Sequence, residues 1–310
     1  MIQNELKKVY ALIKNPIVIQ DIERIVSGLS QSERAVFSGA TILITGCAGF
    51  LGFYMLHVLA KKAEDLGVQK IIGLDNFLVG KPKWLDELVS ETSIIEIYQF
   101  DIITDDLKQI TNAGEANLII HMASVASPTF YRMYPLETID ANIWGLRRLL
   151  NFYRDRKLKG FLFFSSSEVY GDPDPAYIPT EETYRGNVAT TGPRACYDEA
   201  KRFGETLSQI FSNKYGMPIS IVRPFNNYGP GMGIDDKRVP ADFSKAILEG
   251  RDINILSDGS PTRTFCYITD AITGYLKVLC SRRFDIFNIG IEKPEISILQ
   301  LAEIYKTQGE

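Results

Sequence analysis

The chain has 310 residues, a formal net charge of −4 and 45% hydrophobic residues, a composition typical of a globular protein with a sizeable core. No basic block marks a nucleic-acid-binding surface. Four scattered cysteines without a C-x-x-C pair, and only two histidines, predict no metal site. The cysteine usage and the absence of a long apolar N-terminal stretch predict a cytoplasmic protein without a signal peptide or membrane span.

The first 40 residues are predicted to form a helical extension. Apolar residues recur at three- and four-residue steps over residues 6–13 and again over residues 22–29. Pro16 separates the two stretches, because a proline disfavours helix at the residue before it. We therefore predict two short helices that pack on the main domain or on a partner subunit, the main domain being favoured.

From residue 41 onward, short apolar runs alternate with helical stretches. The predicted strands are 41–45, 70–75, 94–100, 118–121, 161–164 and 219–222. The predicted helices between them are about 50–64, 136–156 and 197–215. This alternation predicts βαβ units, hence an α/β fold with a Rossmann-type doubly wound parallel sheet over residues 41–224.

The alternation weakens after residue 224, where Gly, Pro and Asp become frequent. A helix is predicted near 242–249, with short strands near 253–256 and 287–289. Residues 225–310 are therefore predicted to form mainly a smaller, interleaved C-terminal substrate-binding lobe.

A glycine loop follows the first predicted strand directly and precedes a predicted helix. Gly46 permits a tight turn, Gly49 lets the backbone approach a pyrophosphate, and Gly52 allows close packing of helix and strand. Phe50 and Leu51 begin the helix, whose N-terminus favours the phosphates. Glycines also occur in plain turns, but their position between strand and helix favours dinucleotide binding.

Asp75 ends the second predicted strand, beside Asn76. A carboxylate here can accept hydrogen bonds from the ribose hydroxyls and repels a 2′-phosphate, which predicts NAD rather than NADP. The alternative is an aspartate that only stabilises a turn. Most of the further residues expected to contact the cofactor lie at strand ends; the set is Asn76, Asp101, Ile102, Met122, Ala123, Ser124, Ser165, Tyr197, Lys201 and Pro224.

Tyr197 and Lys201 are four residues apart on one face of a predicted helix. An ammonium near the phenol is expected to lower the pKa of Tyr197, which can then take a hydroxyl proton during hydride transfer. The serines of residues 165–167 end the fifth predicted strand, where a hydroxyl can bind the reacting oxygen.

The glycine loop, Asp75, the serine-rich strand end and the Tyr197–Lys201 pair together resemble the extended short-chain dehydrogenase/reductases, the NAD-dependent epimerase/dehydratase family. The resemblance covers about residues 41–305. It implies a nucleotide-sugar substrate with NAD as cofactor, and it assigns Ser166 as the hydroxyl partner of Tyr197 and Lys201. It also implies a homodimer formed by the helices near 136–156 and 197–215, with no nucleic-acid or membrane partner.

Two segments are most similar to UDP-glucuronate decarboxylases, the UDP-xylose synthases. They are residues 165–171, which include Glu168, and residues 192–202 around the tyrosine. Nucleotide-sugar 4,6-dehydratases usually have an aspartate where this chain has Ser167, and 4-epimerases usually lack a carboxylate at the position of Glu168. By this resemblance the substrate-binding residues are Ser127, Pro128, Tyr131, Ser167, Glu168, Asn226, Arg238 and Arg263.

The chemistry of decarboxylation needs no metal. Oxidation of a glucuronate at C4 gives a β-keto acid, which loses CO2 readily. The resemblance makes Arg263 the partner of the sugar carboxylate, a pairing that suits a bidentate guanidinium. Glu168 would orient the ring or the water that protonates C5. The catalytic residues implied are Ser166, Glu168, Tyr197, Lys201 and Arg263.

Several alternatives stay open. Glu168 can instead cap a turn, and Arg263 can instead bind a phosphate. The enzyme can be a 4,6-dehydratase or an epimerase, or the chain can be a non-catalytic NAD-binding regulator. Residues 1–40 have no role in the family pattern, the chain ends several tens of residues earlier than the resemblance implies, and Leu256 and Cys266 differ from the residues usual in decarboxylases.

Overall fold

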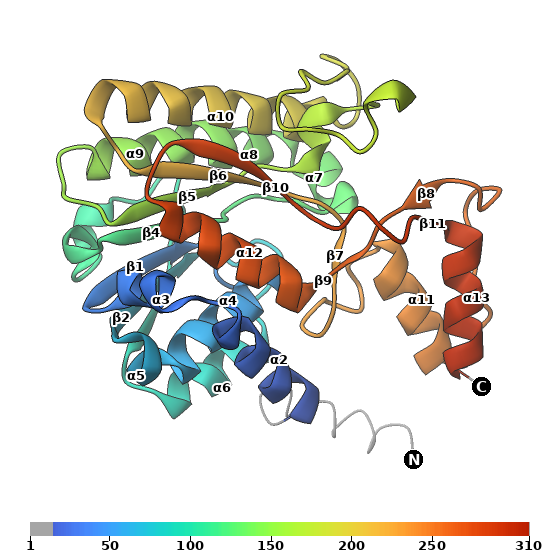
Figure 1. Ribbon diagram of the computed structural model, residues 1–310, viewed down its shortest axis with the longest axis horizontal. Coiled ribbons are helices and arrows are strands. Elements are labelled where there is room, and N and C mark those ends of the chain that lie inside the picture. The colour runs from blue at the N-terminus through green and yellow to red at the C-terminus, as the bar shows by residue number, and fades with distance from the viewer. Residues whose placement is uncertain (1–14, 310) are drawn as a thin grey trace.

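The computed structural model describes residues 15–309 and is built around a seven-stranded parallel sheet (Figure 1). The strand order is β10-β6-β5-β4-β1-β2-β3. The chain adds β2 and β3 on one side of β1 and then crosses to add β4 and the later strands on the other side, so the order of addition reverses between β1 and β4. Ligands of such sheets bind at this reversal, beyond the carboxyl ends of the strands. The strands are β1 (Ala40–Thr45), β2 (Val68–Asp75), β3 (Ile95–Gln99), β4 (Leu118–His121), β5 (Gly160–Phe164), β6 (Ile219–Pro224) and β10 (Asp285–Ile289). The predicted Rossmann-type doubly wound sheet is confirmed.

Helices cover both faces of the sheet (Figure 1). On one face lie α2 (Pro16–Ser27), α3 (Gln31–Phe37), α4 (Phe50–Lys61), α5 (Ala63–Leu66), α6 (Lys83–Glu91) and α12 (Ile268–Ser281). On the other lie α7 (Pro128–Met133), α8 (Pro135–Asp140), a π-helical turn (Ala141–Gly145), α9 (Leu146–Tyr153) and α10 (Ala195–Tyr215). Short 3-10 turns are Leu107–Gln109, Ala113–Glu115, Ser167–Tyr170 and Pro175–Tyr177.

The alternation of side chains along β1 fills two separate cores. Ile42 and Ile44 pack with Phe53 and α12, whereas Leu43 points to the other face and packs with Leu149. All of these named side chains are fully buried. Because both faces of the sheet are covered, the central strands β1, β4 and β5 are buried along their whole length and almost entirely apolar, as the sequence indicated.

The N-terminal segment lies against the main domain. Asn15 caps α2 by accepting a hydrogen bond from the Ile17 amide at 2.9 Å, and Ser30 and Glu33 form a capping box at α3. The apolar face of α2, with Ile22 and Ile25 buried, packs against α4 and α12. The helix predicted over residues 6–13 lies outside the described residues.

A smaller group of elements lies to one side of the sheet (Figure 1). It contains α11 (Val239–Leu248) packed on α13 (Ile298–Gly309), with β8 (Thr262–Arg263) paired antiparallel to β11 (Ile296–Ser297). Nearby, β7 (Asn227–Tyr228) pairs in parallel with β9 (Cys266–Tyr267). By contrast, α12 and β10 come from the same part of the sequence but belong to the main domain: β10 is a strand of the main sheet, and α12 packs on one face of it.

Three expectations for the elements were wrong. Residues 253–256 form no strand, and Leu256 is 91% exposed, because no neighbouring strand lies there to satisfy the backbone. The strand near 287–289 is part of β10 in the main sheet instead of the smaller lobe. The single helix expected over 136–156 is divided by the π-helical turn, and α6 and α12 were not expected at all.

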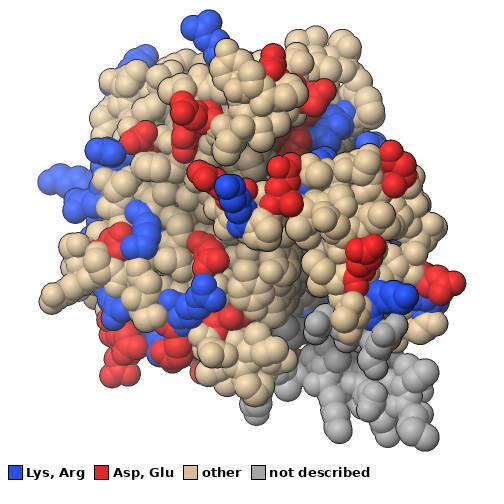
Figure 2. Space-filling model, turned by 45° about the vertical axis from the view of Figure 1, so that its right-hand side comes forward, with Lys and Arg blue, Asp and Glu red and all other residues tan. Residues whose placement is uncertain are grey.

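Charges of both signs are mixed on the surface. On the face shown in Figure 2, Lys and Arg lie interspersed with Asp and Glu, and the described residues there form no broad area of one sign. Within residues 15–309, no helix combines the length and the apolar character needed to cross a membrane.

Candidate active site

The glycine loop between β1 and α4 leaves room for a ligand. Gly46 has φ +71°, and a Cβ there would lie 2.6 Å from the Ala123 amide nitrogen. A Cβ on Gly52 would lie 2.1 Å from the Cys47 carbonyl oxygen. At Gly49, by contrast, a Cβ would meet only the Gly46 carbonyl, at 3.6 Å, so the space above this residue is open.

Gly49 is also the N-cap residue of α4 and offers no side chain to cap the helix. The amides of Phe50 and Leu51 in the first turn are therefore free of a capping side chain and carry the partial positive charge of the helix N-terminus. The open space and these donors fit a dinucleotide pyrophosphate.

Asp75 stands beside this loop at the end of β2. Its two carboxylate oxygens accept hydrogen bonds from the Ala48 and Phe77 amides, each at 2.9 Å. Burial raises the pKa of Asp75, while the two hydrogen bonds oppose that shift. Each oxygen keeps a further lone pair that a ribose hydroxyl can use.

The ends of β3 and β4 approach the same loop. The Met122 amide donates to the Thr45 carbonyl at 3.0 Å, the Ala123 amide to the Thr45 hydroxyl at 3.3 Å, and the Ser124 hydroxyl accepts from Asn142 at 2.9 Å. Asn76 reaches Asp101 at 3.5 Å. Ile102, also expected to contact the cofactor, is buried in the core beside Gly145.

The structure brings the predicted catalytic groups together. Tyr197 and Lys201 lie on one face of α10, both buried, and Tyr197 is hydrogen-bonded to the Ser166 hydroxyl at the end of β5. The Lys201 ammonium donates to the Phe164 carbonyl at 2.7 Å and lies 5.6 Å from the centre of the Tyr197 ring.

The acid–base properties of this pair differ from the sequence-based expectation. Burial raises the pKa of Tyr197, although the Ser166 hydrogen bond and the Arg238 charge oppose it. Burial lowers the pKa of Lys201 to about 7, against the influence of Glu205. The expected lowering of the tyrosine pKa was therefore wrong for the free protein, because desolvation of the phenolate outweighs the nearby cations.

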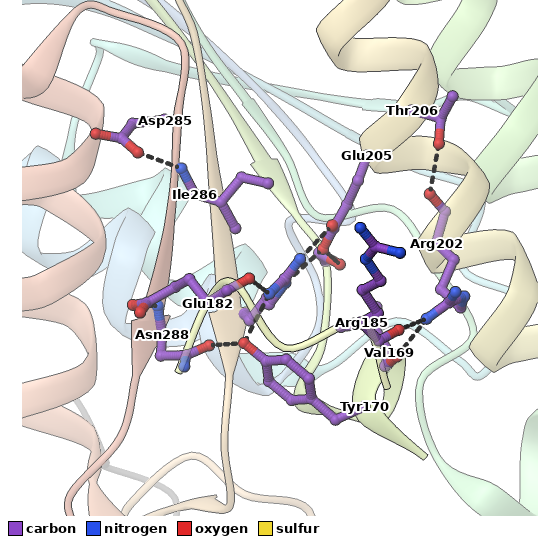
Figure 3. A network of polar contacts seen from close by, with 12 residues as sticks. Val169, Tyr170, Glu182, Arg185, Arg202, Glu205, Thr206, Asp285, Ile286 and Asn288 are labelled. Carbon is purple, nitrogen blue, oxygen red and sulfur yellow. Dashed lines mark hydrogen bonds and ion pairs between the residues drawn. The ribbon is translucent and has the colours of Figure 1, made fainter. Parts of the chain in front are cut away.

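Glu205 anchors the strand end that carries the serines. It accepts a hydrogen bond from the Ser165 hydroxyl at 2.6 Å and a bidentate pair from Arg223 at 2.8 and 2.6 Å. Arg223 also donates to the Tyr170 hydroxyl at 2.6 Å, which donates to Asn288 at 2.7 Å. Figure 3 shows Glu205, Tyr170 and Asn288 of this network, which joins α10 to β10.

Sequence reasoning missed Glu205 and Arg223, although two signals were present. Glu205 is four residues after Lys201 and therefore on the same helix face. Arg223 directly follows the predicted strand 219–222, and a charge at the end of a buried strand needs a partner.

Glu168 forms an ion pair with Arg194, the residue that precedes α10. Arg194 also reaches the Asp198 carboxylate at 3.4 Å, and the Glu168 amide donates to the Ser166 hydroxyl at 3.2 Å. Glu168 is therefore held next to Ser166, the candidate catalytic serine, on the 3-10 turn that begins at Ser167. Arg194 lay within a family-like segment, but sequence reasoning gave it no role.

Tyr131 presents a hydroxyl that has no hydrogen-bond partner among residues 15–309. Its side chain is 2% exposed, and its ring stacks on that of Tyr197, with centres 5.2 Å apart and planes 16° apart. The hydroxyl is buried without a hydrogen bond, an arrangement that costs stability unless a ligand supplies the partner. Pro128 begins α7, the helix that carries Tyr131.

Arg238 links the glycine loop to the tyrosine. Its guanidinium lies 5.6 Å from the centre of the Phe50 ring and influences Tyr197 electrostatically. Asp236 holds it through two contacts, one of them at 2.9 Å, and the Asp236 carbonyl accepts from Ser127 at 3.1 Å. The residues from 236 to 238 thus lie between the expected cofactor and substrate regions.

The other candidates lie further along the chain. Arg263 is exposed on β8 and donates to the Thr262 carbonyl at 2.7 Å, so among the described residues it makes no contact with Ser166, Glu168 or Tyr197. Asn226 donates to the Thr264 carbonyl at 3.2 Å. Pro224 ends β6, where it pairs with Ile289 of β10.

The fold defines a dinucleotide-binding α/β protein of the Rossmann type. The chain belongs to the NAD dependent epimerase/dehydratase family, whose model matches residues 42–290. It is 35% identical over 269 residues to UDP-glucuronic acid decarboxylase 6 of Arabidopsis thaliana, a match that covers 87% of this chain and 74% of the relative. The predicted family is therefore confirmed.

Solved structures of similar fold include two epimerases. A UDP-glucose 4-epimerase of Thermotoga maritima in complex with UDP-glucose is 26% identical with a TM-score of 0.73, over 86% of this chain and 82% of that one. A UDP-glucuronic acid 4-epimerase of Bacillus cereus, in complex with UDP-glucuronic acid and NAD, is 26% identical with a TM-score of 0.71. That match covers 87% of this chain and 83% of the epimerase.

Proposed function

We propose that this protein decarboxylates UDP-glucuronate in an NAD-dependent reaction, through a 4-keto intermediate, to UDP-xylose or its 4-keto form. The observation that carries the proposal is the position of Glu168, a carboxylate next to the Ser166–Tyr197–Lys201 group and paired with Arg194. The decarboxylase relatives support the same substrate.

NAD supplies the hydride acceptor at C4 when it is bound, and the hydride donor when the ketone is reduced again. Its pyrophosphate would be held by the loop of Gly46, Gly49 and Gly52, and its ribose by Asp75. The fit of this group rests on the open space above Gly49 and the uncapped first turn of α4.

Tyr197 acts as the phenolate: after its own hydroxyl proton has been released, it takes the proton of the C4 hydroxyl, which Ser166 also holds, as the hydride leaves C4. The resulting ketone is β to the carboxylate. The C5–C6 bond then breaks, its electron pair forms the C4 enolate, and CO2 leaves. A water oriented by Glu168 returns a proton to C5.

Recognition of the substrate uses the remaining groups. The unpartnered Tyr131 hydroxyl gains a hydrogen-bond acceptor on the sugar, with Ser127, Pro128 and Ser167 beside it. Arg238 and Asn226 meet the diphosphate. Arg263, exposed on β8, pairs with the sugar carboxylate.

The test is to incubate the purified protein with NAD and UDP-glucuronate and to follow the products by mass spectrometry. Loss of the mass of CO2, abolished in Tyr197→Phe although NAD still binds, is the expected result. Accumulation of reduced cofactor would show release of the 4-keto pentose. A product of unchanged mass with inverted C4 would instead establish an epimerase, and NAD binding without any product would favour a non-catalytic regulator.

The protein is also proposed to act as a homodimer through α8, the π-helical turn and α10. Large apolar side chains are exposed there: Leu136 at 69%, Trp144 at 52%, Phe203 at 50% and Ile210 at 51%. Exposed apolar side chains grouped on neighbouring elements mark interaction surfaces. Light scattering should give twice the chain mass, and Phe203→Glu should give the monomer. A wild-type monomer at micromolar concentration would contradict the proposal.

A cytoplasmic location is proposed from the four free cysteines, which suit a reducing compartment. Fractionation of cells that produce the protein should recover it with the cytoplasm. Recovery from a secreted fraction would contradict this.

A further inference from the structure

Helix α2 contacts two distant parts of the fold through a single carboxylate. Asp21 on α2 is 7% exposed, and its Oδ2 accepts hydrogen bonds from the Tyr54 hydroxyl at 2.5 Å and the Tyr267 hydroxyl at 2.9 Å. Tyr54 lies on α4, the helix that follows the glycine loop, and Tyr267 lies on β9. The match to the family begins at residue 42, so this contact comes from an element that precedes it.

Both tyrosines are held as neutral donors. Burial, followed by the hydrogen bond to Asp21, raises the pKa of Tyr54 and of Tyr267. Hydrogen bonds to a charged acceptor are stronger than those between neutral groups. The two contacts therefore fix the positions of α4 and β9 relative to each other.

The strand that carries Tyr267 is continuous with the proposed substrate segments. In β9, Cys266 and Tyr267 pair with Asn227 and Tyr228 of β7, and the Cys266 amide donates to the Asn226 carbonyl at 2.9 Å. Residues 262–267 lead from Arg263 into this strand. A shift of Tyr267 would therefore move both the segment near Asn226 and the segment near Arg263.

The helix that presents Asp21 is itself firmly placed. Val18, Ile22 and Ile25 are buried in the core with α4 and α12. An ion pair at 2.9 Å joins Arg24 to Asp270 on α12. Helix α2 can therefore act as a rigid support for the carboxylate.

We propose that Asp21 is a positioning residue that holds residues 262–267 in register with the cofactor helix α4, and thereby sets the KM for the nucleotide sugar. The part that concerns substrate rests on the proposed function, which assigns Asn226 and Arg263 to the nucleotide sugar. Asp21 itself touches neither cofactor nor substrate in this scheme.

The test compares three variants of the full chain: Asp21→Asn, Tyr267→Phe and, as a matched control, Arg24→Gln. The control removes another contact between α2 and α12 and leaves the hydrogen bond from Tyr267 to Asp21 in place. For the first two variants we expect KM for UDP-glucuronate to rise about fivefold to tenfold. Their kcat and the Kd of NAD should stay within about twofold of wild type, since the reacting groups and the glycine loop are unchanged. In the control variant Arg24→Gln, the KM for UDP-glucuronate, the kcat and the Kd of NAD should be the same as in wild type.

A second measurement separates this proposal from the proposed function. Hydrogen exchange of the peptide covering residues 262–267 needs no turnover, and it should be faster in Asp21→Asn and Tyr267→Phe but not in Arg24→Gln. Equal exchange in all four proteins would overturn the proposal, as would faster exchange with an unchanged KM in an active enzyme. Faster exchange in a protein that releases no CO2 would support the positioning role and reject the decarboxylase function. Tyr267→Phe keeps the ring, so it provides the test even if Asp21→Asn does not fold.

Discussion

The rings of Tyr131 and Tyr197 stack with their centres 5.2 Å apart, and this contact joins a candidate substrate residue on α7 to the candidate base on α10. Both rings are almost fully buried, but within the described part of the chain only the Tyr197 hydroxyl has a partner, Ser166. The two hydroxyls are thus prepared differently: one is held in place for proton transfer, and the other is left without a partner.

Tyr131→Phe should separate binding from stability. In the free protein the change removes a buried hydroxyl without a partner, so the free energy of unfolding should stay the same or rise by about 1 kcal/mol. The KM for UDP-glucuronate should rise about tenfold, with little change in kcat, since a hydrogen bond to substrate is lost. Steady-state kinetics and thermal melts measure both. A loss of stability with unchanged KM would show that the hydroxyl only supports the fold.

Gly52→Ala should reduce the stability of the fold, whereas Gly49→Ala should reduce the affinity for NAD. At Gly52 the added Cβ would lie 2.1 Å from the Cys47 carbonyl, so the protein should be destabilised by several kcal/mol, about 3 or more. At Gly49 the Cβ would meet no protein atom nearer than 3.6 Å, so the melting temperature should be kept. NAD affinity should nevertheless fall about tenfold or more, because the methyl group occupies the space of the pyrophosphate. Calorimetric titration with NAD would decide, and normal binding by Gly49→Ala would place the pyrophosphate elsewhere.

The sequence predicted the main sheet well because its signals are local. The apolar runs that became β1, β4 and β5, and the glycine loop after β1, need only short-range periodicity and strand–turn–helix order to be recognised. Contacts between residues far apart in the sequence could not be predicted in this way. The contact of the candidate catalytic residue Glu168 with Arg194, and those of Asp21 with Tyr54 and Tyr267, join residues 26 or more positions apart, so they depend on the packing of whole elements.

Arg263 shows a different limit of prediction from sequence. Its motif suggests that it binds the sugar carboxylate or a phosphate, and the structure places the side chain exposed on β8, in the pairing with β11. Either role depends on a bound substrate rather than on contacts among the described residues, so it stays a prediction. Residues 253–256 were predicted as a strand but form none. A short run with β-branched residues becomes a strand only where another strand accepts its hydrogen bonds, and the sequence of the run does not show whether one lies nearby.

Glu168→Gln should reduce catalysis more than stability. The ion pair with Arg194 is about 40% exposed at each side chain, and such pairs contribute about 1 kcal/mol or less. If Glu168 orients the water that protonates C5, kcat should fall about 10²-fold while NAD affinity is kept. Glu199→Gln is the control, since its ion pair with Arg202 is similarly exposed. Equal, small losses in kcat for both variants would argue that Glu168 only caps its turn.

Glu205→Gln should instead reduce stability strongly. Glu205 and Arg223 are 12% and 8% exposed, and breaking such a buried pair leaves an uncompensated guanidinium at a cost of about 3–5 kcal/mol. The melting temperature should fall by about 10 °C. The double variant Glu205→Gln with Arg223→Met should recover part of this loss, because no buried charge remains unpaired. No recovery in the double variant would show that Glu205 stabilises the fold mainly through Ser165.

Lys201→Met should alter how stability depends on pH. The folded-state pKa of Lys201 is lowered to about 7 by burial, whereas the unfolded value is 10.5. Between these two pH values Lys201 binds a proton in the unfolded chain but not in the folded protein. The free energy of unfolding of the wild-type protein therefore rises with pH over this range. Below pH 7 both states are protonated, and the full cost of burying the ammonium is present. The variant should therefore melt about 5 °C above wild type near pH 6, with a difference that shrinks towards pH 10. Lys214→Met, an exposed position on the same helix, should show no such trend. A difference between Lys201→Met and wild type that does not change with pH would mean that Lys201 stays protonated in the folded protein throughout this range.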